Sequence, residues 1–120
     1  MNSIDKTILV ADDDFAILHS VRMLLEDEGY HVITTDGDKT AQEVKEHLPD
    51  LILLDIWMSG TDGRDICKHL KSQARTKHIP IIMISARQDT EKIAKESGAD
   101  DFVAKPFDIF NLLKKIEQYV

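Results

Sequence analysis

Carboxylate, hydroxyl and ammonium side chains follow the apolar segments of this 120-residue chain. The residues in question are Asp12, Asp13, Asp14, Asp55, Ser85 and Lys105. Mg²⁺ prefers oxygen ligands and typically takes one or two carboxylates together with phosphate oxygens. A carboxylate can also act as a nucleophile and form an aspartyl phosphate. These residue types therefore indicate magnesium-assisted phosphoryl transfer onto an aspartate.

Each of these residues also has a structural explanation when it is taken alone. An aspartate cluster before a helix can cap that helix, and Lys105-Pro106 is a common loop dipeptide. Asp55, however, closes the aliphatic run Leu51–Leu54, where bare carboxylates lower stability unless a cation is present. A metal would neutralise the transferring phosphoryl group, Lys105 would add a second positive charge, and Ser85 would hydrogen-bond a phosphoryl oxygen.

Five short apolar runs indicate the strands that must position these residues. Most of the runs are continuous, which is typical of strands covered on both faces. The runs are Ile8–Ala11, Val32–Ile33, Leu51–Leu54, Ile81–Ile84 and Phe102–Ala104.

Helical spacing fills the intervals between the runs. The expected helices contain Ile17–Leu25 (stopping at Gly29), Ala41–Leu48 (ended by Pro49), Ile66–Leu70, Thr90–Ser97, and Ile109–Val120 with Asp108 as N-cap. The segment Thr90–Ser97 offers only Ile93 and Ala94 as clear core contacts. This alternation predicts an α/β fold with a parallel sheet, whose sites form beyond the carboxyl ends of the strands.

Composition limits the classes of function. The formal charge of −7 argues against nucleic-acid binding by this domain, because phosphate contacts need clustered Lys and Arg. The single cysteine, Cys67, excludes an internal disulfide and is most simply a packing residue. Met1–Lys6 lacks the features of a signal peptide, and the apolar stretches are too short to span a bilayer. We therefore expect one cytoplasmic domain over residues 1–120, without a membrane partner.

Five ordered segments resemble the receiver domain of bacterial two-component response regulators, essentially from Thr7 to Val120. The segments are Ile8–Asp14, Leu53–Asp55, Met58–Gly63, Ile84–Ala86 and Gly98–Phe107. The resemblance implies a doubly wound (βα)5 fold with a five-stranded parallel sheet of order 2-1-3-4-5 and helices on both faces. It also implies a phosphoacceptor switch rather than an enzyme, taking part in its own phosphorylation and slow dephosphorylation.

The resemblance implies a role for each matching residue. Asp55 would be the phosphoacceptor, and Lys105 would pair with Asp55 or its phosphoryl group. Mg²⁺ would be held by Asp12, Asp13, Asp55 and the Trp57 carbonyl. The switch residues would be Ser85, through its hydroxyl, and Phe102, through its aromatic ring. The output surface would comprise the fourth helix, fifth strand and fifth helix. The phosphodonor would be a histidine kinase or a histidine phosphotransfer domain, sometimes a small acyl phosphate. The downstream partner is not implied.

Three departures from the family pattern carry expectations. Ser59 replaces the usual proline, so the loop after Asp55 should be less rigid. The stretch from Ser85 to Gly98 is about two residues short, and we hypothesise that the fourth helix is marginally stable and moves on phosphorylation. Asp100 and Asp101 match the charged dimer pattern of winged-helix regulators, whereas Glu91 and Asn111 do not, so we do not expect that dimer. The sequence leaves open a stand-alone receiver or a piece of a larger regulator or hybrid kinase.

Trp57 and Arg87 each lie two residues beyond a site residue. In the family these positions tune the lifetime of the phosphoryl group, and we hypothesise that the bulk of Trp57 lengthens it. Trp57 also speaks against a haloacid-dehalogenase-like phosphatase, which would carry a second aspartate at that position. Asp12–Asp14 speaks against a flavodoxin-like FMN binder, whose phosphate loop is rich in Ser, Thr and Gly. The remaining alternative is a receiver-like interaction module that takes no phosphoryl group.

Overall fold

A computed structural model describes residues 5–58 and 60–120, and the prediction about Ser59 lies outside the described residues. A five-stranded sheet has the order β2-β1-β3-β6-β7, with every neighbouring pair parallel. Its strands are β1 (Thr7–Ala11), β2 (His31–Thr35), β3 (Leu51–Asp55), β6 (Ile81–Ser85) and β7 (Asp101–Ala104). In chain order within this sheet, that is the predicted order 2-1-3-4-5, and the prediction is confirmed.

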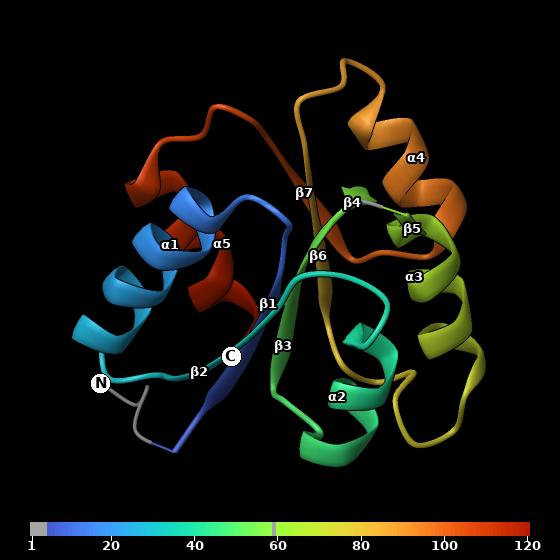
Figure 1. Cartoon of the computed structure of the whole chain (residues 1–120), viewed down its shortest axis with the longest axis horizontal. Helices are drawn as coiled ribbons and strands as arrows, with labels where there is room; N and C mark the ends of the chain where they lie inside the picture. The colour runs from blue at the N-terminus through green and yellow to red at the C-terminus, as the bar shows by residue number, and fades with distance from the viewer. Residues whose placement is uncertain (1–4, 59) are drawn as a thin grey trace.

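Helices cover both faces of the sheet. They are α1 (Phe15–Asp27), α2 (Thr40–His47), α3 (Gly63–Ser72), α4 (Thr90–Ser97) and α5 (Ile109–Tyr119). Helices α1 and α5 lie on one face and α2, α3 and α4 on the other (Figure 1). The fold is therefore the doubly wound α/β architecture that the alternation of apolar runs and amphipathic segments predicts.

The two layers of helices explain why the strands are continuously apolar. Alternate residues of β3 enter different cores: Leu51 and Leu53 pack with α1 and α5, whereas Ile52 and Leu54 pack with α2, α3 and α4. Burial stabilises each such side chain by about 1.5–3 kcal/mol. Cys67 of α3 is buried in the second core, where burial raises its pKa to about 11, in keeping with a packing role.

Side-chain caps start two helices as the sequence predicts. The Asp14 carboxylate accepts a hydrogen bond from the Ala16 N–H of α1, and Asp108 accepts one from the Phe110 N–H of α5, both at 2.9 Å. The end of α2 differs from the prediction. Leu48 was expected on the apolar stripe, but its φ of 45° is left-handed and its side chain is 42% exposed. The turn that ends α2 therefore removes Leu48 from the core.

Two further features bear on the site. A short antiparallel pair, β4 (Trp57–Met58) and β5 (Thr61–Asp62), follows β3 and was not predicted, because two-residue strands leave no periodic pattern. Helix α4 buries Ile93 and Ala94, as expected, and ends at Gly98 with a φ of 87°. Among the described residues, no helix has the length and apolarity to cross a bilayer.

Candidate functional site

Four strands bring the predicted site residues to the same end of the sheet. Asp12 directly follows β1, Asp55 is the last residue of β3, Ser85 is the last residue of β6, and Lys105 directly follows β7. Because these strands are parallel, their carboxyl ends lie side by side. The parallel sheet thus brings together residues that lie up to 93 positions apart in the sequence.

The gathered side chains form an acidic cluster around one ammonium group. Asp12, Asp13 and Asp55 each offer a carboxylate oxygen, and these oxygens lie within 4.8 Å of one another. The Lys105 Nζ lies 3.0 Å from Asp12 Oδ2 and 3.5 Å from Asp55 Oδ2. Asp12 and Asp55 are 0% and 5% exposed. Two buried carboxylates therefore share a single lysine.

The balance of charge shifts the pKa values of these groups. Burial, followed by the charge of Asp12, raises the pKa of Asp55 to about 7, against the opposing effect of Lys105. Burial would lower the pKa of Lys105, but its close contact with Asp12 and the charges of Asp12 and Asp55 raise it above its usual value. The carboxylates thus hold the lysine protonated, while the negative charges of the cluster outnumber its one positive charge.

The donor set suits a hard divalent cation. Asp12 Oδ2 is fully buried and, within the described part of the chain, accepts no hydrogen bond of good geometry despite its ion pair with Lys105. All the converging groups from Asp12, Asp13 and Asp55 are carboxylates, the ligands that Mg²⁺ prefers. Asp14, by contrast, directs its carboxylate to the N-terminus of α1. The residues present therefore fit Mg²⁺.

The backbone after Asp55 closes tightly on the site. The Gly63 N–H donates a 2.7 Å hydrogen bond to the Ile56 carbonyl, and the Trp57 N–H donates to the Asp55 carboxylate. A Cβ atom at Gly63 would collide with the Asp55 carbonyl oxygen, so only glycine permits this approach. No role is predicted for Gly63 from the sequence, although its place at the end of the Met58–Gly63 segment, which resembles the family, could have indicated one.

The two predicted switch residues lie on neighbouring strands. The Ser85 hydroxyl accepts a 3.1 Å hydrogen bond from the Arg87 N–H. Phe102 is half-buried against the core beneath α2, α3 and α4, and Lys115 Nζ lies 4.8 Å from the centre of its ring. Ser85 and Phe102 do not pair in the sheet register, because Phe102 is opposite Met83. Phe102 therefore lies two residues further from the carboxyl end than Ser85.

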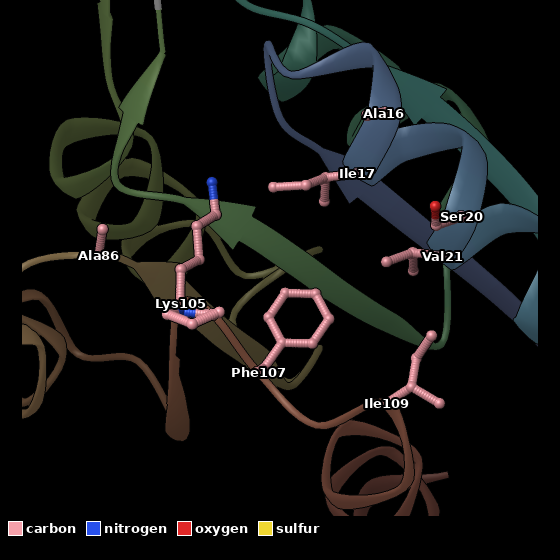
Figure 2. Close-up of a pocket in the computed structure, with 9 residues that line it drawn as sticks. Ala16, Ile17, Ser20, Val21, Ala86, Lys105, Phe107 and Ile109 are labelled. Atoms are coloured by element: carbon pink, nitrogen blue, oxygen red, sulfur yellow. The ribbon is translucent and has the colours of Figure 1, made fainter.

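An apolar groove of about 450 Å³ adjoins the site on the α1 side. Figure 2 shows Ile17 and Val21 of α1 across from Phe107, with Lys105 at one end of the groove. Lys105 thus contributes its aliphatic chain to the groove and its ammonium group to the acidic cluster.

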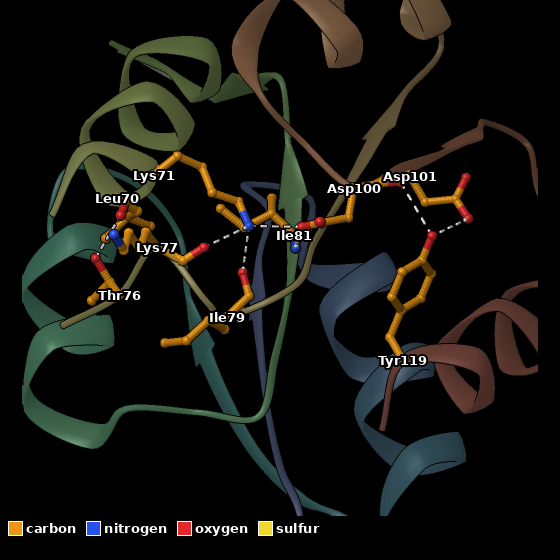
Figure 3. A network of polar contacts seen from close by, with 9 residues as sticks. All are labelled: Leu70, Lys71, Thr76, Lys77, Ile79, Ile81, Asp100, Asp101 and Tyr119. Atoms are coloured by element: carbon orange, nitrogen blue, oxygen red, sulfur yellow. Dashed lines mark hydrogen bonds and ion pairs between the residues drawn. The ribbon is translucent and has the colours of Figure 1, made fainter. Parts of the chain in front are cut away.

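A second polar cluster occupies the amino ends of β6 and β7 (Figure 3). The Lys71 ammonium lies 2.8 Å from Asp100 Oδ2, 2.8 Å from the Ile79 carbonyl oxygen and 3.2 Å from the Lys77 carbonyl oxygen. Asp100 Oδ2 also accepts a 2.8 Å hydrogen bond from the Ile81 N–H. This cluster joins the end of α3 to the beginnings of two strands.

Asp101 has its own partners in this cluster. It accepts hydrogen bonds from Lys115 Nζ at 2.9 Å and from the Tyr119 hydroxyl at 3.1 Å. Burial would raise the pKa of Asp101, but the hydrogen bonds from Lys115 and from the backbone hold it below its usual value. Asp100 and Asp101, which match the dimer pattern, thus both pair within the chain.

Comparison with known proteins assigns this arrangement to a class. The family model "Response regulator receiver domain" matches residues 8–117. The chain therefore belongs to the receiver domain family of two-component response regulators. Receiver domains are phosphoacceptor switches that are phosphorylated by histidine kinases and generally bind Mg²⁺ at an acidic pocket. They are signalling domains rather than conventional enzymes.

Individual relatives and structures agree with this assignment. The DNA-binding response regulator MtrA of Mycolicibacterium smegmatis is 35% identical over 119 residues, which are 97% of this chain and 51% of that protein. The phosphate regulon regulator PhoB of Escherichia coli is 36% identical over 115 residues, 93% of this chain and 50% of that protein. The chain thus spans about half the length of these relatives.

Solved structures match over nearly the whole chain. The chemotaxis response regulator CheY4 of Vibrio cholerae has a TM-score of 0.88 and 30% identity, covering 96% of this chain and 98% of that one. A putative response regulator from Chloroflexus aurantiacus has a TM-score of 0.89 and 30% identity, covering 95% and 96% respectively.

Proposed function

We propose that Asp55 is the phosphoacceptor of this receiver domain and that it takes its phosphoryl group from a histidine kinase or a histidine phosphotransfer domain. The observation that carries the proposal is the placement of a buried Asp55 carboxylate 3.5 Å from the Lys105 ammonium and beside Asp12 and Asp13. In the transfer, an Asp55 oxygen attacks phosphorus. The bond from phosphorus to the donor nitrogen breaks, and the donor imidazole leaves with the bonding electrons.

The residues around Asp55 have distinct proposed roles. Asp12 and Asp13, with Asp55 and the Trp57 carbonyl, would hold Mg²⁺, which neutralises phosphoryl charge when it is bound. In the phosphorylated state Lys105 would pair with the phosphoryl oxygens, and this contact would replace its resting ion pair with Asp55. The resting cluster supports these roles because its three carboxylates surround a single ammonium group, which leaves negative charge for a bound cation to balance.

The proposed readout passes through Ser85 and Phe102. The Ser85 hydroxyl accepts a hydrogen bond from Arg87 and remains able to donate one to a phosphoryl oxygen. Movement of Ser85 would change the packing of Phe102 on the adjacent strand and so reach the surface of α4, β7 and α5. We retain the hypothesis that α4 is marginally stable; equal hydrogen exchange at residues 90–97 in the free and phosphorylated forms would contradict it.

The domain itself is proposed to act in the cytoplasm, without contacting nucleic acid or membrane, and its output partner is left open. MtrA is named as a DNA-binding regulator, but the present chain matches only about half of it. The net charge of −7 does not favour DNA binding by this part. The domain boundaries remain the proposed residues 1–120.

The test is phosphoryl uptake from a small acyl phosphate, followed by intact mass. We expect the parent protein to gain one phosphoryl group only with Mg²⁺, and Asp55→Asn to gain none. Asp14→Asn is the matched control, because Asn also caps helices and Asp14 lies on the α1 terminus rather than in the cluster. If acyl phosphates and a phosphorylated histidine donor both fail on the parent, the domain is a receiver-like interaction module instead.

A further inference from the structure

Trp57 is the single tryptophan of the chain and lies in β4, two residues beyond Asp55. Its backbone N–H donates to the Asp55 carboxylate, while its side chain is 41% exposed. Asp55 is the last residue of β3, so a phosphoryl group on it would project beyond the carboxyl end of the strand, where the chain continues into Trp57. Water that attacks phosphorus in line must approach from the same side. The position of the indole therefore bears on the survival of the phosphoryl group.

Arg64 covers one side of the indole and is itself held in place. Its guanidinium carbon lies 4.5 Å from the centre of the Trp57 ring, within cation–π range. The guanidinium makes a two-pronged ion pair with Asp62, at 2.8 and 3.1 Å. Asp62 pairs with Trp57 across β4 and β5 and also accepts the Arg64 N–H at 2.9 Å. Arg64 is thus fixed by its backbone and its side chain to the strand that faces Trp57.

Arg87 provides a second guanidinium, from the loop after β6. Its guanidinium carbon lies 5.4 Å from the Trp57 ring centre, and Asp89 accepts hydrogen bonds from the guanidinium at 3.0 and 3.2 Å. Its backbone N–H donates to Ser85. The indole is therefore contacted by Arg64 from the first turn of α3 and by Arg87 from the loop after β6, where the Arg87 backbone also contacts Ser85.

The rest of the chain holds Arg64 and Arg87 in different ways. Arg64 follows Gly63, whose close approach to Asp55 and hydrogen bond to Ile56 tie the start of α3 to the floor of the site. Arg87 lies on an exposed loop whose neighbouring Ser85 is the proposed moving group. The proposed movement of Ser85 would shift Arg87, whose backbone donates to Ser85, whereas the contact of Arg64 with the indole does not involve Ser85.

We infer that Arg64 is a positioning residue: anchored by Asp62, it holds the Trp57 indole at the rim of the phosphoacceptor pocket and thereby slows hydrolysis of the phosphoryl group. The inference rests on the proposed role of Asp55. In the hydrolysis, water oxygen attacks phosphorus and the bond from phosphorus to the Asp55 oxygen breaks. Asp55 keeps the bonding electrons as a carboxylate, inorganic phosphate leaves, and the proton from water passes to solvent. A fixed indole restricts the approach of that water.

The first measurement uses the resting protein and needs no phosphorylation. Acrylamide quenching of Trp57 fluorescence should increase in Arg64→Met relative to the parent, because the indole loses its firmer guanidinium contact. Asp62→Asn should show an intermediate increase, since Asn keeps the helix cap but loses the ion pair. Arg22→Met is the matched control, because Arg22 is half-exposed and paired with Glu26 at 3.2 Å on α1. Quenching in Arg64→Met equal to the parent would overturn the inference.

The second measurement follows loss of the phosphoryl group after the donor is removed, with Mg²⁺ present. Hydrolysis in Arg64→Met should be about two- to fivefold faster than in the parent. Loss of one exposed cation–π contact lowers the population of the held indole by about this factor. Trp57→Ala should also be faster. If Arg64 acts through the indole, adding Arg64→Met to Trp57→Ala should change the rate no further. Arg22→Met should hydrolyse at the parent rate.

Each contrary outcome has a separate meaning. Parent and Arg64→Met hydrolysing at the same rate would overturn the inference while leaving the proposed function intact. An additional rate increase from Arg64→Met in the Trp57→Ala background would also overturn it, because Arg64 would then act on the phosphoryl group directly. A parent protein that gains no phosphoryl group from any donor would overturn the proposed function, and the inference with it.

Discussion

The two clusters of aspartate and lysine at opposite ends of the sheet use the same residue types with opposite results. At the carboxyl ends of the strands, Asp12 and Asp55 share Lys105, and the pKa of Asp55 is raised to about 7. At the amino ends, Asp100 pairs with Lys71 and Asp101 pairs with Lys115. There the pKa of Asp101 is lowered, despite partial burial.

The difference lies in how many ammonium groups serve the carboxylates, because Asp12 and Asp55 share Lys105 whereas Asp100 and Asp101 each have a lysine of their own. Asp100 has an ammonium group and a backbone N–H, and Asp101 has an ammonium group, a hydroxyl and a backbone N–H. Each ion is thus stabilised by the chain itself. In the Asp55 cluster, three carboxylates face one ammonium group, and the excess negative charge is what a bound cation would balance. A satisfied cluster holds elements together, whereas an unbalanced one is ready to bind.

The largest expected effect comes from breaking the satisfied cluster. Lys71→Met removes the partner of Asp100 and leaves two backbone carbonyl oxygens without their ammonium donor. The free energy of unfolding should fall by about 2–4 kcal/mol. Urea denaturation measures this loss, with Lys68→Met on the exposed face of the same helix as control. A loss no greater than that of the control would show that the two clusters do not differ in this way.

An effect of opposite sign is expected in the unbalanced cluster. Without Mg²⁺, Asp55→Asn should stabilise the protein at pH 8, by about 1–2 kcal/mol, because it removes one of two neighbouring buried carboxylates. The pKa of Asp55 in the folded state, about 7, lies above its ordinary value of 3.8. The folded state therefore binds the proton more tightly, and this contribution to stability is lost as the pH rises from about 4 to beyond 7.

The measurement is thermal unfolding of parent and Asp55→Asn between pH 5 and pH 8. The gain in stability should be larger at pH 8 than at pH 5, and Mg²⁺ should stabilise the parent more than the variant. A destabilised Asp55→Asn at pH 8 would mean that Lys105 already balances the cluster.

The smallest expected effect comes from trimming the satisfied cluster. Tyr119→Phe removes a hydroxyl that donates at 3.1 Å to both the Asp100 carbonyl oxygen and Asp101. Asp101 keeps Lys115, so the free energy of unfolding should fall by only about 0.5–1 kcal/mol. Urea denaturation gives the value. A loss as large as that of Lys71→Met would mean that the hydroxyl, rather than the ammonium groups, secures this end of the sheet.

Much of the fold could be predicted because its signals are local. The runs Leu51–Leu54 and Ile81–Ile84 are continuous because helices cover both faces of those strands. The caps Asp14 and Asp108 act on residues two positions away. Leu48 was misplaced because its left-handed backbone is not encoded by apolar spacing. The β4–β5 pair was missed because its strands are too short for periodicity.

The sequence by itself determined the order of the elements and the positions of chemically capable residues at the ends of strands. It also carried the family resemblance, which the family model and the relatives bear out. Both depend on residue type and spacing along the chain, and both can be read without coordinates.

Only the tertiary structure decided which charges meet. Nothing in the spacing shows that Lys105 serves both Asp12 and Asp55, or that Asp100 and Asp101 are paired within the chain. The contact of Arg64 with Trp57 likewise follows from the β4–β5 pair and the close approach at Gly63. Charge interactions depend on distance and burial in three dimensions, and packing of distant segments sets both.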